Sequence, residues 1–419
     1  MNVDAPELSV IIPVFNKWEL TRDCLESLRQ HTEGCDFEVL VADNGSSDAT
    51  AQECPNLGMA LFPGRFRHLR FETNLNFGPA CNAGAKAASG ALLLFLNNDT
   101  LLSPGWLPPL LAALRSNERV GAVGPLLVYP ERLGLGPRVQ HLGIVVEPQL
   151  YPQHLHEYFP VDHPLVRKRR SVQALTAAAL LLRRSLFFEC GGFCEEYKNG
   201  GEDVDLGVQI AKRGYSQFCV PESRVTHLVG QTPGRTDNER HNAQVLKARC
   251  RADLVPDLAY HAQKDGYELR LTECLRPYLA LPARRAEVLN RRAQVGLDPQ
   301  LCRELLAREP LWLEGYGLLA RHCETAGDLT GACAQRFLES RFAPTEAVFT
   351  ELLRLSELSG EEACRRSAES WLLWRRQERA ADLVASALEA ADYMERLRLA
   401  EVAALYRGWA AGKGRAATF

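Results

Sequence analysis

Three carboxylates stand close together in the sequence, directly after a pair of glycines at residues 200–201. Glu202, Asp203 and Asp205 precede residues 208–213, whose apolar spacing is helical. The dipole of a helix favours the ionised form of acids in its first turn. A positioned carboxylate can remove the proton of a weak nucleophile, such as a hydroxyl group, while that nucleophile attacks. We predict that Asp203 is a general base, that Glu202 binds a substrate hydroxyl and that Asp205 caps the helix.

Another acid, Asp99, follows an apolar run. Residues 91–96 have the composition of a buried strand and lead into Asn97 and Asp99. A strand holds a carboxylate rigidly, and hard divalent cations prefer oxygen ligands. A cation at this place can neutralise charge on a departing diphosphate. We predict that Asp99 is a direct metal ligand and that Asn97 supplies at most a neutral oxygen. His227 is predicted to complete the metal shell or to contact a phosphate, with an ordinary core or surface histidine as the alternative.

Polar residues also follow the first strands. Asp43 ends the apolar residues 37–42, and a carboxylate there can accept hydrogen bonds from a uracil or thymine N–H or from a ribose hydroxyl. A simple turn is the alternative. Gly78 precedes a small-residue helix whose N-terminus offers unpaired N–H groups to an anion. Arg235 lies in a loop and is predicted to close over a diphosphate.

Strand and helix patterns alternate through the first half of the chain. Such alternation is typical of an α/β fold with a mostly parallel central sheet covered on both faces. The ligand site of such a sheet lies at the carboxyl ends of its strands. We expect strands at residues 8–15, 37–42, 68–71, 91–96, 172–182 and 217–220, and helices at residues 18–31, from 48 onward, 79–88 and 107–115.

The pattern changes at about residue 255, where strand-like runs disappear and Leu, Ala, Arg and Glu dominate. A chain of 419 residues exceeds one ordinary core. We therefore predict a catalytic domain at 1–255 and an all-α helical domain at 256–419. One segment has the spacing of a tetratricopeptide-like (TPR-like) helical hairpin. The helical domain is therefore either a degenerate array of such repeats or an unrelated helical bundle. The residues of the hairpin segment are Tyr316, Leu319, Ala320, Cys323, Gly327, Ala332 and Pro344.

Composition excludes several classes of protein. The net charge of −3 provides no positive field for nucleic acid. The 13 cysteines contain no CxxC, which argues against a zinc site and for a reducing compartment. There is no signal-peptide pattern, and the apolar runs are too short for a transmembrane segment. We expect a cytoplasmic protein, with peripheral contact at the inner face of a membrane as an alternative. The basic residues 167–170 are expected to form a solvated loop, or else to contact an anionic acceptor or membrane.

Taken in order, these segments resemble the family 2 glycosyltransferases of GT-A fold. The resemblance covers about residues 7–235, and the last motif residue within it is His227. It implies a nucleotide-sugar donor, Mn²⁺ or Mg²⁺ as cofactor, and inversion at the sugar carbon. Residues 97–99 stand where the family has its Asp-x-Asp metal motif, in the variant of rhamnosyltransferase-like members. The predicted donor-binding residues are Pro13, Phe15, Asn16, Asp43, Asn74, Gly78, Asn82, Asn98 and Arg235.

Three residues depart from the pattern of the family. Asn97 replaces the first Asp of the metal motif, Cys194 stands where Asp is frequent, and Gln209 where Arg is frequent. These departures leave the donor sugar open.

The sequence thus predicts an inverting glycosyltransferase that moves a sugar from a UDP- or dTDP-sugar. The acceptor hydroxyl belongs to a glycan, a lipid-linked sugar or a protein, and the helical domain is expected to hold an acceptor, a partner or a second copy of the chain as a homodimer. One alternative is a sugar nucleotidyltransferase, but the Gly-rich phosphate loop of that class is missing after the first strand. Another is a degenerate platform that acts through its helical domain. The prediction requires Asp43, Asp99 and Asp203 to converge at one pocket.

Overall fold

The computed structural model describes residues 5–229, 238–294, 298–377 and 380–416. Its centre is a ten-stranded sheet with the order β10-β12-β6-β11-β4-β1-β2-β3, while β5 pairs with β12 and β7 with β6. Four neighbouring strands, β3, β2, β1 and β4, are parallel, and β11 runs against β4 and β6. The bounds are β1 Leu8–Val14, β2 Phe37–Asp43, β3 Phe66–Arg70, β4 Leu92–Leu96, β5 Thr100–Leu102, β6 Val120–Val128, β7 Val139–His141, β10 Arg170–Val172, β11 Ala179–Arg183 and β12 Ser216–His227.

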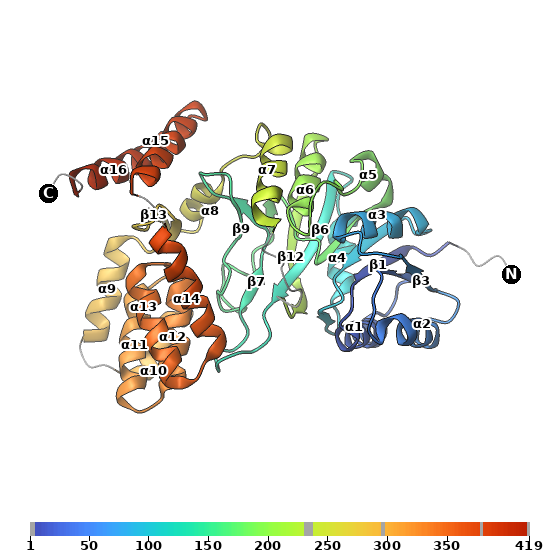
Figure 1. The fold of residues 1–419 in the computed structure, drawn as a ribbon, viewed down its shortest axis with the longest axis horizontal. Helices are drawn as coiled ribbons and strands as arrows, with labels where there is room; N and C mark the ends of the chain where they lie inside the picture. Colours follow the sequence, from blue (N-terminus) through green and yellow to red (C-terminus); the bar gives the residue numbers. More distant parts are fainter. Residues whose placement is uncertain (1–4, 230–237, 295–297, 378–379, 417–419) are drawn as a thin grey trace.

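Helices cover both faces of the sheet because its central strands β1, β2 and β4 are mostly apolar and are buried at nearly every position. Along β1, Val10 and Ile12 pack into one buried cluster and Ile11 into the other, as the alternation of side chains along a strand requires. Helices α1 and α2 lie on one side of the sheet, and α3 and α5 on the other (Figure 1). The bounds are α1 Trp18–His31, α2 Thr50–Leu61, α3 Phe77–Ala87, α4 Leu107–Arg115, α5 Arg184–Glu189, α6 Glu202–Lys212 and α7 Glu239–Cys250. The predicted α/β class with a GT-A type sheet is confirmed.

The strand predicted at residues 172–182 is wrong as a single element. It consists of β10 and β11, which are separated by residues 173–178. The segment between the strands is buried although it is not part of a strand, which is why it has the composition of one. Ala177 and Ala178, for example, are only 3% and 4% exposed.

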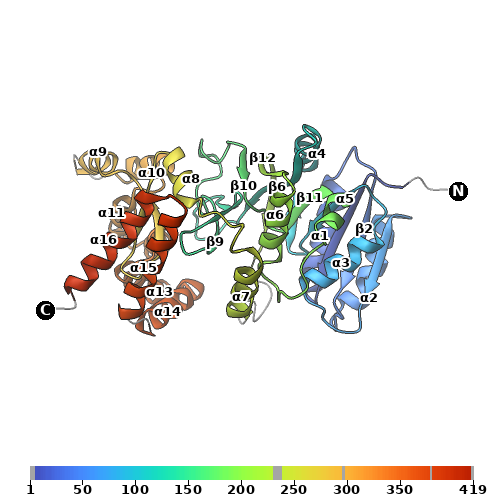
Figure 2. The same cartoon turned by 90° about the horizontal axis from the view of Figure 1, so that it is seen from above.

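The second half is helical, and successive helices pack on each other at the end of the molecule opposite to α2 and β2 (Figure 2). The hairpin predicted around Tyr316 is α11 followed by α12, with a turn at Gly327; its assignment to the tetratricopeptide type stays a prediction, as does the domain division at residue 255. The bounds are α8 Leu258–Lys264, α9 Ala283–Gln294, α10 Pro299–Arg308, α11 Leu313–Thr325, α12 Leu329–Phe342, α13 Glu346–Ser359, α14 Glu362–Gln377, α15 Ala380–Arg396 and α16 Ala400–Ala416.

Strands do not disappear after residue 255, contrary to the prediction. β13 (Glu268–Leu271) and β14 (Pro277–Ala280) form an antiparallel hairpin between α8 and α9. A second hairpin, β8 (Ile144–Val146) and β9 (Pro152–His154), lies in the first half. In the described ranges, no helix is both long and apolar enough to cross a membrane.

The two halves share one hydrophobic core. Phe159 from the first half packs edge-on against Phe342 with 5.8 Å between ring centroids, and Tyr158 packs against Phe337 at 5.5 Å. One buried cluster extends from β1 to α14. The halves are therefore joined by packed side chains as well as by the chain itself.

A buried ion pair reinforces this junction and corrects the expectation of a solvated basic loop. Arg170 donates a hydrogen bond to Asp265 at 2.8 Å, and His156 Nε2 lies 2.7 Å from the other oxygen of the same carboxylate. The side chains of Arg170 and Asp265 are 5% and 1% exposed. The exposed residues of the run are Arg167, which pairs with Asp162, and its neighbours, so the run is only partly a surface feature.

Candidate active site

A cavity of about 1400 Å³ opens at the carboxyl ends of β1 and β4. Pockets for single small ligands are typically about 300–1,000 Å³, so this one has room for more than a single small molecule. Its wall contains residues from elements that are far apart in sequence. Among the predicted site residues it includes Pro13, Phe15, Asn16, Asn74, Asn97, Asn98, Asp99, Glu202, Asp203 and His227.

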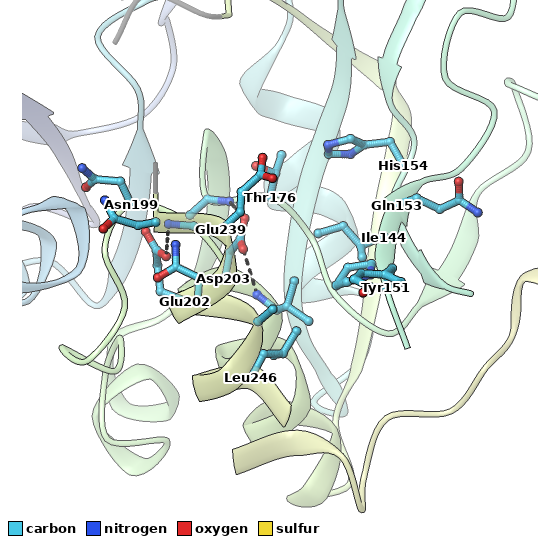
Figure 3. A pocket seen from close by; sticks show the side chains of 18 of the residues that line it. Ile144, Tyr151, Gln153, His154, Thr176, Asn199, Glu202, Asp203, Glu239 and Leu246 are labelled. Atoms are coloured by element: carbon cyan, nitrogen blue, oxygen red, sulfur yellow. Dashed lines mark hydrogen bonds between the residues drawn. The ribbon is translucent and has the colours of Figure 1, made fainter. Parts of the chain in front are cut away.

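The two acids at the start of α6 face this cavity from a tightly held turn (Figure 3). Asp203 accepts hydrogen bonds from the backbone N–H groups of Ala177, at 3.2 Å, and Val204, at 2.9 Å. Glu202 is 5% exposed and accepts from Gly200 N at 2.7 Å. Asp203 is the more accessible of the two and has its orientation fixed by two backbone donors, as a general base requires.

The turn before α6 needs glycine. Gly201 has φ 99°, and a Cβ atom added there would lie 2.9 Å from the ring of Tyr197. Residues with side chains rarely adopt this backbone conformation. The glycine therefore sets the direction in which Glu202 and Asp203 leave the helix.

Asp205 does not cap the helix as predicted. It is 1% exposed, and it accepts hydrogen bonds from Tyr197 Oη at 3.2 Å, from Gln209 Nε2 at 3.1 Å and from Arg249 of α7. A buried carboxylate needs such partners to offset its lost hydration. Asp205 thus fixes α7 against α6 and does not line the cavity.

Strand pairing creates the predicted metal corner. His227 at the end of β12 lies opposite Thr100 of β5, and Leu228 N donates to Asp99 O at 2.9 Å. This register places His227 Nε2 3.1 Å from Asp99 Oδ1 and 3.3 Å from Asn97 Nδ2. Two residues that are more than a hundred positions apart are therefore adjacent.

The hydrogen bond of His227 to Gln140 indicates which ring nitrogen carries the proton. Gln140 Oε1 lies 2.9 Å from His227 Nδ1, and a carbonyl oxygen only accepts, so Nδ1 carries the proton. Nε2 then has a lone pair directed at Asp99, which suits a divalent cation that Nε2 and a carboxylate oxygen both bind. Within the described residues no group of three or more His, Cys, Asp and Glu side chains could hold a metal ion.

Asp43 does not converge with the other acids. It is fully buried and absent from the cavity wall; Ser46 N donates to its Oδ1 at 2.8 Å, and Arg70 donates to Oδ2 at 3.2 Å. Burial acts to raise the pKa of Asp43, but contacts with His68 and Ser46 outweigh it and lower the pKa. The carboxylate thus stays ionised and holds the turn behind the cavity.

Two further donor-binding predictions fall on packing residues. Asn82 is 7% exposed; its Nδ2 donates to Phe193 O and its Oδ1 accepts from Phe193 N, both at 2.9 Å. Gly78 packs against the same loop, where an added Cβ would lie 3.4 Å from Cys194 O. Neither lines the cavity, because α3 turns these positions toward the Gly-Gly-Phe loop. Arg235 lies outside the described residues.

Comparison with known proteins identifies the family. The sequence model of Glycosyl transferase family 2 matches residues 9–189. The N-acetylglucosaminyl-diphospho-decaprenol L-rhamnosyltransferase of Mycobacterium tuberculosis is 31% identical over 214 residues, which are 47% of this chain and 68% of that protein. The chain belongs to glycosyl transferase family 2.

Other family 2 relatives differ in how much of their length is matched. The O-antigen biosynthesis protein RfbC of Myxococcus xanthus is 34% identical over 268 residues, 62% of this chain but only 19% of that protein. The chain therefore spans about a fifth of that relative. A validoxylamine A glucosyltransferase of Streptomyces hygroscopicus subsp. limoneus is 31% identical over 319 residues, 70% of this chain and 68% of the relative.

Sequence reasoning missed the part of this family 2 cavity that lies nearer the helical half. Glu147 and Tyr151 reach it from the β8–β9 turn, and Trp374 and Tyr393 from α14 and α15. No motif marks these residues, because they are brought to the cavity by packing between distant elements. A signal that could have found Trp374 and Tyr393 is the presence of aromatic residues on helix faces that are otherwise polar.

Proposed function

We propose that the chain is an inverting glycosyltransferase that moves a sugar from a UDP- or dTDP-sugar to an acceptor hydroxyl. The observation that carries the proposal is that Asp203 and the Asp99–His227 pair line the same cavity. A base and a cation corner in one cavity can act on opposite ends of the reacting sugar. The names of the family 2 relatives, which include a rhamnosyltransferase and a glucosyltransferase, support this class of reaction.

Asp99 and His227, with Asn97 beside them, are the residues that would hold Mn²⁺ or Mg²⁺. When bound, such an ion stabilises the negative charge of the departing nucleoside diphosphate. Because the described residues offer few ligands at this place, we expect diphosphate oxygens to supply others. On the nucleotide side, Asn16 is held in place by its Oδ1, which accepts from Ser47 N at 2.8 Å. The turn at Asn16 and the exposed Phe15 form part of the same cavity wall as Asp99 and His227.

Asp203 removes the proton of the acceptor hydroxyl. The hydroxyl oxygen then attacks the anomeric carbon from the face opposite the diphosphate, the bond to the diphosphate oxygen breaks, and the configuration inverts. A direct displacement needs no second, nucleophilic carboxylate. This agrees with the engagement of Glu202 by Gly200 N, which leaves Glu202 to fix the turn and to bind a sugar hydroxyl with its remaining acceptor capacity.

The Asp203→Asn variant tests the proposal. It should lower turnover at least about a hundredfold, the usual scale for loss of a general base, while a UDP- or dTDP-sugar with Mn²⁺ still raises the thermal midpoint. The surface variant Glu118→Gln is the matched control and should behave as wild type. Full turnover in Asp203→Asn would contradict the base assignment. Nucleotide-sugar binding without transfer to any acceptor in the wild type would favour a binding platform instead.

A further inference from the structure

The cavity continues beyond Asp203 toward the helical half. Its far part, which we call the interdomain arm, is lined by Glu147 and Tyr151 of the β8–β9 turn, Arg276 of the β13–β14 turn, and Trp374 and Tyr393 of the last helices. Figure 3 shows Tyr151 on the side of the cavity opposite to Glu202 and Asp203. A ligand in this arm therefore extends from the proposed base toward the second half of the chain.

Aromatic rings and guanidinium groups are paired in the arm. The guanidinium carbon of Arg276 lies 4.9 Å from the ring centroid of Trp374, and that of Arg251 lies 5.5 Å from the ring of Tyr393. Tyr151 is 53% exposed. An aromatic face buries the C–H surface of a pyranose, and a guanidinium donates several hydrogen bonds to hydroxyl oxygens in fixed directions. This combination matches the amphipathic surface of a sugar ring.

Glu147 supplies the arm with a hydrogen-bond acceptor, Oε2, that receives no donor from the described residues. The residue is 9% exposed, and its Oε2 makes no hydrogen bond within the described part of the chain. Burial raises the pKa of Glu147 to about 7, and the nearby charge of Arg276 limits the rise. A buried carboxyl oxygen that lacks a donor is costly, and a sugar hydroxyl can supply that donor.

The arm is held rigidly by both halves of the chain. Gln149 Nε2 donates to Leu275 O at 3.0 Å, and Tyr406 Oη of α16 donates to Gln149 Oε1 at 2.8 Å. Within the β8–β9 turn, Glu147 N donates to Tyr151 O at 2.9 Å. The turn is therefore fixed against the helical half, so the arm exists as a preformed site, which lowers the entropic cost of binding.

We propose that the interdomain arm binds the acceptor as a carbohydrate chain, with Trp374 and Arg276 forming a platform for one sugar unit and Glu147 accepting from its hydroxyls. The inference rests on the proposed function, because it places the end of the chain at Asp203. The shared chemistry is a glycan of several sugar units, whether free or attached to a lipid diphosphate.

The test measures glycan binding separately from donor binding. Wild type, Trp374→Ala and the control Leu373→Ala, an exposed neighbour on the same helix, are titrated with a panel of free oligosaccharides of two to six units. A second arm uses the same glycans on a polyprenyl diphosphate in detergent. Thermal shift with UDP and Mn²⁺ reports the donor site in all three proteins. We expect Trp374→Ala to weaken glycan binding at least tenfold and Leu373→Ala to leave it unchanged, with equal shifts from UDP.

Each outcome decides the inference. Trp374-dependent binding in both arms identifies the glycan itself as the ligand, and Trp374-dependent binding in the lipid arm alone identifies a lipid-linked glycan. Equal binding by wild type and Trp374→Ala, or no binding of any glycan by the wild type, would overturn it. Glu147→Gln, which keeps the shape of the side chain, should also weaken binding and guards against a folding effect in the tryptophan variant. Absence of a thermal shift with both UDP and dTDP in the wild type would instead count against the proposed function.

Discussion

His227 Nε2 lies 3.1 Å from Asp99 Oδ1, although His227 ends β12 and Asp99 lies in the turn before β5, more than a hundred residues earlier in the sequence. The antiparallel pairing of β5 with β12 creates this contact, and Gln140 fixes the tautomer of His227. Removing either partner should therefore affect a bound cation more than the fold.

Changing His227 to Ala should weaken the binding of Mn²⁺ together with UDP by about 10- to 100-fold, the usual effect of losing part of a metal site. Wild type should bind Mn²⁺ weakly alone and more tightly with UDP, because diphosphate oxygens would add ligands to Asp99 and His227. Isothermal titration of Mn²⁺ with and without UDP measures both effects. His322→Ala, on α11, is the control; equal affinities in wild type and His227→Ala would exclude His227 as a ligand.

The Gly201→Ala variant should be destabilised by about 1–3 kcal/mol, the cost of one residue in a sparsely populated backbone region, and should lose most of its turnover. Its φ of 99° and the 2.9 Å approach to Tyr197 leave no room for a methyl group. Gly105→Ala is the matched control, since it also has a positive φ (76°) but nothing within 4 Å. Urea unfolding compares the two. Similar losses in both variants would mean that strain alone, without the clash, sets the cost.

The Asp265→Asn variant should lose about 3–5 kcal/mol at pH 7, because it leaves Arg170 buried without its carboxylate partner. Burial acts to raise the pKa of Asp265, but hydrogen bonds from His156 and Arg170 lower it to about 2. The folded pKa is below the unfolded one, so the stabilisation is present above about pH 4 and is lost as the pH falls toward 2. Asp162→Asn, which removes exposed ion pairs with Arg167 and Arg224, should cost less than about 1 kcal/mol. Urea unfolding at pH 7 measures both.

Glu147 should have the opposite pH dependence. Its pKa is raised to about 7, so the folded state binds more protons than the unfolded state between about pH 4.5 and 7, and stability falls as the pH rises through that range. Tyr406, whose pKa burial raises, stays neutral over this range. Glu147→Gln should match wild type near pH 4.5 and exceed it by up to about 3 kcal/mol at pH 8. Thermal unfolding of both proteins across this pH range measures the difference in stability. A difference that stays constant with pH would show that Glu147 is not the group responsible.

The sequence predicted β1, β2 and β4 because these strands are mostly apolar and are followed by polar residues, but it did not predict the central strand β6. Local signals also placed Asp99, after an apolar strand, and Asp203, after two glycines, at the wall of one cavity. Their roles as metal ligand and base stay predictions, as does the metal role of His227, which strand pairing places beside Asp99.

The errors have a common physical origin. Asp43 and Asn82 are polar residues beside the site, and their sequence context does not reveal that neighbouring groups such as Ser46 and Phe193 satisfy them. Glu147 and Trp374 could not be found, because contacts between halves that are about two hundred residues apart place them in one wall. Local patterns predict which residues are polar at strand ends, but not which of them have their partners inside the protein.

The ring contact between Phe159 and Phe342, which belong to different halves of the chain, implies that the two halves unfold together. A polypeptide cut at residue 255 would present these rings to water, and at about 1.5–3 kcal/mol for each large side chain uncovered, neither fragment would keep the cooperativity of the intact chain. Calorimetry of the full chain should then show a single heat-absorption peak, and changes to the helical half should shift the temperature at which the half that contains the large sheet unfolds.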